Sequence, residues 1–217
     1  MEDMINKMST LDWIIFWLAI ASFIPLIIVV IIKKGAGQNS TTWTLWFILD
    51  VIQFTVTILA HGSWVVLTAY MLGSGTIALI LPKKKISFRK SIKDIFINLI
   101  IILKKKKISH LSFEFKISIL VISCVIIWLS SSAYYGVIFA TVAQVLAGIP
   151  LFLDNWKNPQ VNALPSYIGF FTANVLTTFT APEFTVPYVL FSGVFVLSGL
   201  LYVIPIVRKL RQDYIKI

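Results

Sequence analysis

Seven apolar stretches, separated by short polar segments, dominate the chain. They cover Trp13–Ile32, Thr42–Ala60, Gly62–Leu81, Ile117–Ser132, Tyr134–Leu153, Leu164–Thr180 and Val186–Val207. Most of them approach the length of about 20 apolar residues that a helix needs to cross a bilayer. The pattern therefore predicts an all-α integral membrane protein with seven transmembrane helices.

The composition supports a membrane protein and excludes several other classes. Hydrophobic residues make up 58% of the 217 residues and charged residues 13%, whereas soluble domains average about 45–50% and about 25%. Seven spans leave no room for a large soluble catalytic domain. Cys124 is the one cysteine and lies in an apolar stretch, so we expect neither a disulfide framework nor a cysteine-based metal cluster. Glu2 and Asp3 stand where a signal peptide would be basic, so we expect the first helix to be retained.

The distribution of positive charge predicts the orientation. If the N-terminus lies outside, every lysine and arginine except Lys7 falls on the inner side of the seven predicted spans. Because basic residues accumulate on the cytoplasmic side, we expect an N-out, C-in protein of the cell membrane, plasma or inner. The net charge of +10 then reflects this orientation, and we expect no nucleic-acid partner.

A long basic segment lies between the third and fourth stretches. It contains a nine-residue apolar run, Ile95–Leu103, between the basic clusters Lys83–Lys85 and Lys104–Lys107. At about 1.5 Å per residue this run covers about 14 Å, too little for a core about 30 Å thick. Two interpretations remain: a segment lying in the headgroup layer against anionic lipid, or an ordinary positive inner loop with an apolar patch.

The first three and last three stretches resemble each other in sequence. A shift of 124 residues lays the second stretch on the sixth and pairs Trp46 with Phe170 and Asp50 with Asn174. A shift of 125 pairs Pro25 with Pro150. We therefore predict 3+1+3 parallel repeats: a first three-helix unit (1–82), a basic loop plus linker helix (83–132) and a second three-helix unit (133–217).

One segment carries a family resemblance. Gly148-Ile-Pro-Leu-Phe-Leu-Asp-Asn-Trp-Lys-Asn-Pro159-Gln160, followed by Pro165-Ser166-Tyr167, resembles the PQ-loop signature. The PQ-loop superfamily contains SWEET sugar carriers, their half-size bacterial relatives and PnuC-type carriers. In the first unit the corresponding dipeptide is Gly37-Gln38, and the loop proline is missing. The resemblance implies the 3+1+3 fold, transport by alternating access, and hinge prolines at Pro25, Pro150 and Pro165.

Polar residues inside the spans predict a binding site. Trp46, Asp50 and Gln53 share one helical stripe, which the sixth stretch repeats as Phe170, Asn174 and Thr177. Asp50 lies about 12 Å and Asn174 about 15 Å from the inner helix ends, at 1.5 Å per residue. A carboxyl near the midplane is expected to face a polar interior. Asp50 and Asn174 are therefore expected to face each other and bind a polar solute. Gln53, Thr177 and Gln144 are expected as further polar ligands, and the rings of Trp46, Phe170 and Trp64 are expected to stack on the solute. The alternative is that Asp50 only joins helices.

These features predict a carrier rather than an enzyme. The sequence shows no phosphate-binding glycine loop, no nucleophile paired with a base and no metal-ligand spacing, so neither a cofactor nor a metal is expected. We expect a sugar-like or nucleoside- or vitamin-like solute, moved by facilitated diffusion or with protons carried by Asp50. The alternative is a non-transporting receptor or scaffold on the same fold, as KDEL receptors resemble it. A homo-oligomer is left open.

Overall fold

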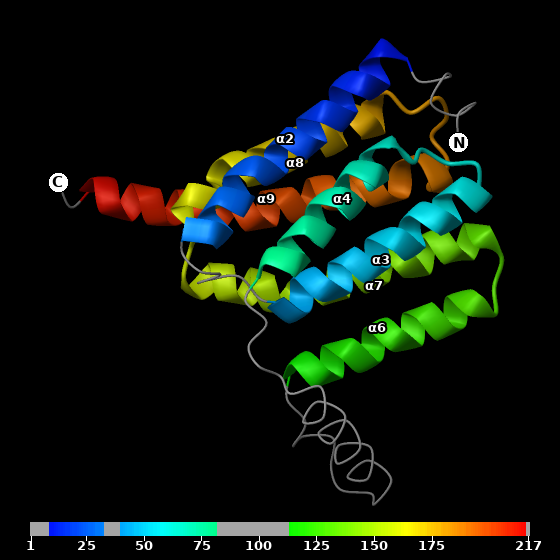
Figure 1. Cartoon of the computed structure of the whole chain (residues 1–217), viewed down its shortest axis with the longest axis horizontal. Helices are drawn as coiled ribbons and strands as arrows, with labels where there is room; N and C mark the ends of the chain where they lie inside the picture. Colours follow the sequence, from blue (N-terminus) through cyan, green and yellow to red (C-terminus); the bar gives the residue numbers. More distant parts are fainter. Residues whose placement is uncertain (1–8, 33–39, 82–112, 216–217) are drawn as a thin grey trace, which may run out of the picture.

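The computed structural model describes residues 9–32, 40–81 and 113–215, and these ranges form a helical bundle (Figure 1). They contain no strand and one 3-10 helix, η2 (Val161–Ala163). The α-helices of these described ranges are α2 (Thr10–Ile32), α3 (Ser40–Leu59), α4 (Val65–Ile80), α6 (Phe113–Leu129), α7 (Ala133–Lys157), α8 (Leu164–Phe179) and α9 (Val186–Ile215). Each predicted apolar stretch therefore corresponds to one helix. The run Ile95–Leu103, both basic clusters around it and Gly37-Gln38 lie outside the described residues.

The bundle has the surface of a membrane protein. Four helices are long and apolar enough to cross a membrane: α2, α7, α9 and the segment Thr42–Leu59 of α3. Large apolar side chains cover the outside of the bundle; Trp17 is 59% exposed and Leu79 is 79% exposed. Soluble monomers rarely expose such extended apolar surface. The composition and the surface together indicate a protein that sits in a lipid bilayer.

The helices form two groups of three, with the third helix of each group in the middle. In the first triplet α4 packs against both α2 and α3, and in the second α9 packs against both α7 and α8. The triplets meet where α2 contacts α8 and where α3 contacts α7. Helix α6 packs against α7 at the edge of the bundle (Figure 1). The two triplets therefore share one helix order and enclose the space between them.

One contact inside each triplet is closely matched. A Cβ atom added to Gly75 of α4 would lie 2.8 Å from the Phe47 ring of α3. A Cβ atom added to Gly199 of α9 would lie 3.4 Å from Cβ of Phe171 on α8. In both triplets a glycine lets the middle helix approach a phenylalanine of its neighbour. The glycines and the phenylalanines are each separated by the shift of 124 residues.

The helix ends follow local signals rather than the apolar stretches alone. Helix α2 starts with a capping box, because Ser9 and Asp12 hydrogen-bond each other's backbone N–H at 3.1 and 2.9 Å. Helix α4 starts at Val65, three residues after the predicted start at Gly62. His61 there adopts a left-handed conformation (φ 56°), and the Gly62 N–H closes the preceding helix by donating to the Thr57 carbonyl at 2.8 Å.

Helix α9 continues beyond its predicted end at Val207. It runs to Ile215 and extends past the other helices of the bundle (Figure 1). Within this extension Lys209 and Asp213 form an ion pair of 3.3 Å one turn apart. We call the end of the bundle from which α9 protrudes the C-terminal end; α2, α4 and α7 also end there, and α3 and α8 begin there.

Candidate functional site

A pocket with a cavity volume of about 60 Å³ lies between the two triplets. All helices except α6 contribute to its lining. Eight of its thirteen lining residues are aromatic, namely Phe23, Trp43, Trp46, Tyr70, Tyr167, Phe170, Phe195 and Tyr202. The others are Asp50, Ser74, Gln144, Ser198 and Gly199. The pocket therefore combines an aromatic wall with a few polar groups, as small-molecule sites commonly do.

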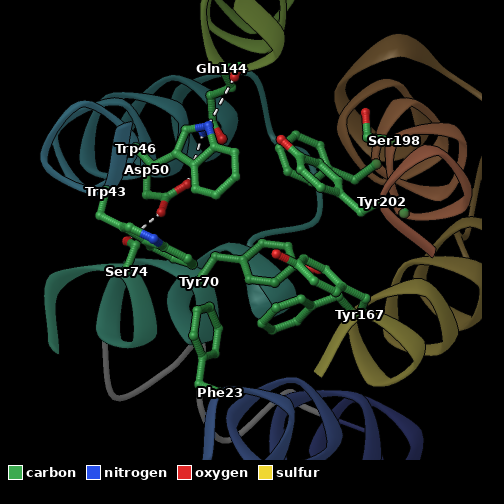
Figure 2. Close-up of a pocket in the computed structure, with 13 residues that line it drawn as sticks. Phe23, Trp43, Trp46, Asp50, Tyr70, Ser74, Gln144, Tyr167, Ser198 and Tyr202 are labelled. Atoms are coloured by element: carbon green, nitrogen blue, oxygen red, sulfur yellow. Dashed lines mark hydrogen bonds between the residues drawn. The ribbon is translucent and has the colours of Figure 1, made fainter. Parts of the chain in front are cut away.

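Asp50 of α3 is the polar centre of the pocket. Ser74 of α4 donates a hydrogen bond from Oγ to Asp50 Oδ2 at 2.6 Å, and Gln144 of α7 donates from Nε2 to Oδ1 at 2.9 Å. Figure 2 shows these side chains converging beside the pocket. The three residues are 3%, 2% and 1% exposed. A carboxylate has about four acceptor positions, so these two bonds orient Asp50 and leave it capacity to accept more.

Trp46 is held in place at the side of the pocket near α7. Its indole N–H donates to the backbone carbonyl of Gln144 at 3.0 Å. A Cβ atom added to Gly148 of α7 would lie 2.9 Å from Trp46 Cζ2, so the ring lies directly against the α7 backbone. Because Trp46 and Asp50 are one helical turn apart, the indole and the carboxyl lie side by side (Figure 2).

A group of aromatic rings lines the C-terminal side of the pocket. Tyr167 and Tyr202 stack with centroids 5.2 Å apart and an interplanar angle of 4°. The Tyr202 hydroxyl donates to the Gly148 carbonyl at 2.9 Å. Trp43 meets Trp46 edge to face with centroids 5.0 Å apart. Side chains from α3, α8 and α9 thus cover the end of the pocket nearest the starts of α3 and α8.

A second group of rings packs toward the opposite end of the bundle. Tyr70 contacts the rings of Phe23, Phe170, Phe191 and Phe195, with centroids 5.6 to 5.9 Å apart. Phe191 and Phe195 stack at 4.4 Å. Tyr70 is 6% exposed. These rings join α2, α4, α8 and α9 into one aromatic layer.

The structure brings four of the predicted binding residues to this pocket. Asp50, Trp46, Phe170 and Gln144 line it. Asn174 does not: its side-chain amide donates to the Tyr70 hydroxyl and to the Phe170 carbonyl. Asn174 is therefore connected to the pocket through Tyr70, and does not meet Asp50 across it as the sequence pattern suggested. Within the described structure, its Oδ1 atom is buried without a hydrogen-bond partner.

The other three predicted ligands lie elsewhere. Gln53 donates to Thr57 Oγ1 at 3.2 Å and accepts from Thr141 Oγ1 at 3.4 Å, forming a separate buried polar cluster between α3 and α7. The Thr177 hydroxyl donates to the Ala173 carbonyl of its own helix. Trp64 packs edge to face with Phe54 just before α4 begins. None of the three lines the pocket.

The segment that carries the motif resemblance ties helix ends together. Asn155 of α7 donates from Nδ2 to the Tyr202 carbonyl at 3.0 Å and accepts from the Gln160 N–H at 3.2 Å. The Gln160 side chain donates to the Asn158 carbonyl at 3.3 Å. Pro159 and Gln160 therefore belong to the connection between α7 and η2, outside the pocket.

The predicted hinge prolines occupy two kinds of position. Pro25 lies inside α2 and Pro150 inside α7, where a proline removes one backbone hydrogen bond. Pro165 lies in the first turn of α8, where no helical hydrogen bond is lost. Pro205 lies inside α9 and is a further interruption, which is not one of the three predicted hinge positions.

Several lining residues escaped the sequence analysis, although a signal existed for some of them. The shift of 124 residues, continued into the third and seventh stretches, pairs Ser74 with Ser198. The same shift pairs Trp43 with Tyr167. All four residues line the pocket. Matched positions of the two triplets therefore contribute to one site.

Comparison with known proteins provides no name for this arrangement. No protein family, curated protein or solved structure matches the chain. In the described residues no three His, Cys, Asp or Glu side chains cluster in a way that would hold a metal ion.

Proposed function

We propose that the protein is a membrane carrier for a small polar solute, and that the pocket around Asp50 is its solute site. The observation that carries this proposal is the position of the pocket. It lies between the two triplets and places a buried carboxyl beside aromatic rings from both. A carrier of this kind binds its solute at the interface of two units that move relative to each other.

The arrangement of the helices supports two parallel repeats joined by α6. Both triplets place their third helix in the middle, and both repeat the glycine–phenylalanine contact between the second and third helices. If α2 corresponds to α7 and α3 corresponds to α8, the contact between α2 and α8 is equivalent to the contact between α7 and α3. An approximate two-fold relation between the triplets, as proposed for the 3+1+3 PQ-loop and SWEET-like fold, accounts for all of these pairings.

The proposed mechanism is a rocking motion of one triplet against the other. The rings of Trp43, Tyr167 and Tyr202 then form a gate at the C-terminal end, which the N-out, C-in orientation places on the cytoplasmic side. Pro25 and Pro150 provide points where the α2 and α7 helices can bend. A ring-bearing solute, such as a sugar, nucleoside or vitamin, would lie against the rings and bind Asp50, with or without a coupled proton.

The second candidate is a receptor or scaffold, and one surface favours it. A polar pocket with a cavity volume of about 390 Å³ opens at the C-terminal end beside Lys157, Arg208 and Lys209. Arg208 donates to the Trp156 carbonyl at 2.9 Å and lies over the Trp156 ring at 4.7 Å. These basic side chains would attract a protein partner with acidic groups, or anionic lipid.

Flux in proteoliposomes tests the two candidates against each other. The wild type and Asp50→Asn are reconstituted and the uptake of labelled sugars, nucleosides, vitamins and amino acids is measured with and without a pH gradient. A carrier gives saturable uptake of one class that Asp50→Asn lowers at least tenfold, while Asp154→Asn on the exposed end of α7 leaves it unchanged. A receptor or scaffold gives no uptake of any class.

A further inference from the structure

The ionisable side chains that line the pocket indicate which class of solute it favours. Among the described residues that line the pocket, Asp50 is the one acidic side chain, and none is a lysine, arginine or histidine. A buried carboxylate without a basic partner is costly unless another positive group compensates it. The pocket therefore disfavours an anionic solute and stabilises a positive one.

Four hydrogen-bond donors of the pocket lining are already engaged within the protein. Ser74 donates to Asp50, and Ser198 donates to the Val194 carbonyl at 3.0 Å. The Trp46 N–H and the Tyr202 hydroxyl donate to backbone carbonyls of α7. An uncharged polyol needs donors as well as acceptors around it, and these four donors are already in use, whereas Asp50 keeps capacity to accept.

Because these polar groups are hydrogen-bonded within the protein, the faces of the aromatic rings form the main remaining contact surface of the pocket. Five of the eight rings belong to Trp or Tyr, and Trp and Tyr faces attract cations more strongly than Phe does. Such contacts are stronger when the ring and the cation are shielded from water. Since Trp46 is fixed through its N–H, its ring lies beside the carboxyl without a rotamer change.

We propose that the solute is a small organic cation, such as a quaternary ammonium compound. Asp50 is its counter-ion, and the Trp46 ring is a surface on which the charged group lies. This inference rests on the proposed function, because it takes the pocket to be the solute site. It narrows the solute class from polar rings in general to positively charged groups.

Pairs of cations and their uncharged isosteres test the inference. Choline is compared with 3,3-dimethylbutan-1-ol, and N-methylpyridinium with toluene, by thermal stabilisation of the purified protein over a concentration series. We expect each cation to bind at least tenfold more tightly than its isostere. Asp50→Asn is expected to reduce this ratio below threefold with little change for the isostere, while Asp154→Asn leaves the ratio intact.

The outcomes distinguish this inference from the proposed function. Equal binding of cation and isostere overturns the cationic class, and the comparison on the wild type needs no variant to fold. Binding of glucose or adenosine that Trp46→Ala abolishes, with no cation bound, also overturns it but keeps the pocket as the solute site. Absence of binding by every compound, together with absence of flux, overturns both. If Asp50→Asn fails to elute as a single species, Ser74→Ala and Trp46→Phe replace it.

Discussion

The hydrogen bond from Ser74 to Asp50 predicts a difference between two serines that otherwise match. Ser74 and Ser198 both line the pocket and are separated by the shift of 124 residues. Ser74 bonds a buried carboxyl of another helix at 2.6 Å, whereas Ser198 bonds a carbonyl of its own helix at 3.0 Å. Ser74→Ala therefore leaves Asp50 with one partner, Gln144, and Ser198→Ala leaves no group of another helix unpaired.

The expected loss in the free energy of unfolding on Ser74→Ala depends on two factors: the Ser74 hydroxyl bonds a carboxylate, and this bond joins two helices inside a membrane. Hydrogen bonds to charged groups contribute about 1.5–3 kcal/mol, but polar contacts between membrane helices average about 0.6 and reach about 1.7 kcal/mol. We expect Ser74→Ala to lower the free energy of unfolding by about 1–2 kcal/mol, and Ser198→Ala to lower it by less than about 0.5 kcal/mol. For a chain of about this length, 1 kcal/mol corresponds to about 2–4 °C in Tm, which gives about 2–8 °C for Ser74→Ala.

Tryptophan fluorescence during heating of the detergent-solubilised protein measures both variants. Each substitution removes one hydroxyl from the pocket lining, so loss of pocket surface is matched between them. A clearly larger loss in Tm for Ser74→Ala supports the carboxylate bond as a link between α3 and α4. Equal losses within about 1 °C, below the shift that about 0.5 kcal/mol gives, would refute the reasoning.

Two further predictions concern backbone contacts around the pocket. Gly148→Ala places a methyl group 2.9 Å from the Trp46 ring, so we expect solute binding at least tenfold weaker in a titration, while Gly193→Ala, which meets nothing within 4 Å, leaves it unchanged. Asn155→Leu removes two hydrogen bonds that join α7 to α9 and to the η2 connection, and a loss of about 1–3 kcal/mol is expected as a lower Tm. Asn158→Leu, on an exposed neighbour, is the control, and equal effects of the two Asn variants would contradict this assignment.

The apolar pattern predicted the helices better than their ends. Each of the seven apolar stretches became one helix because stretch length and hydropathy report burial in lipid. They do not report where a helix stops in water. Helix α9 continues through Arg208–Ile215, since this segment contains good helix formers and the Lys209–Asp213 pair.

The candidate site was predictable where a residue stood out from its surroundings. Asp50 was found because a carboxyl in an apolar stretch is rare and tends to face a polar interior. The separation of Asn174 from Asp50 was not predictable, because it depends on which helix lies between them. The placement of α4 in the middle of its triplet brings Tyr70 next to Asn174. Ser74 stands between Gly73 and Gly75, and a run of small residues in a membrane helix is typical of close helix packing rather than of a binding site.

The differences between the two triplets determine where the solute's charge is expected. In the proposed repeat Trp46 corresponds to Phe170, and Gly148 corresponds to Phe23. Trp46 fills the space above Gly148 on one side, and Phe170 packs against Phe23 with centroids 4.6 Å apart on the other.

These two contacts occupy equivalent interfaces with different chemistry. The interface of α3 with α7 holds an indole next to a carboxyl, and the interface of α8 with α2 holds two phenyl rings. A solute bound between the triplets therefore meets one charged wall and one apolar wall. Because the Coulomb energy falls with distance and rises in a low-dielectric interior, the positive group of the solute is expected on the α3 and α7 side, and its apolar part against Phe23 and Phe170.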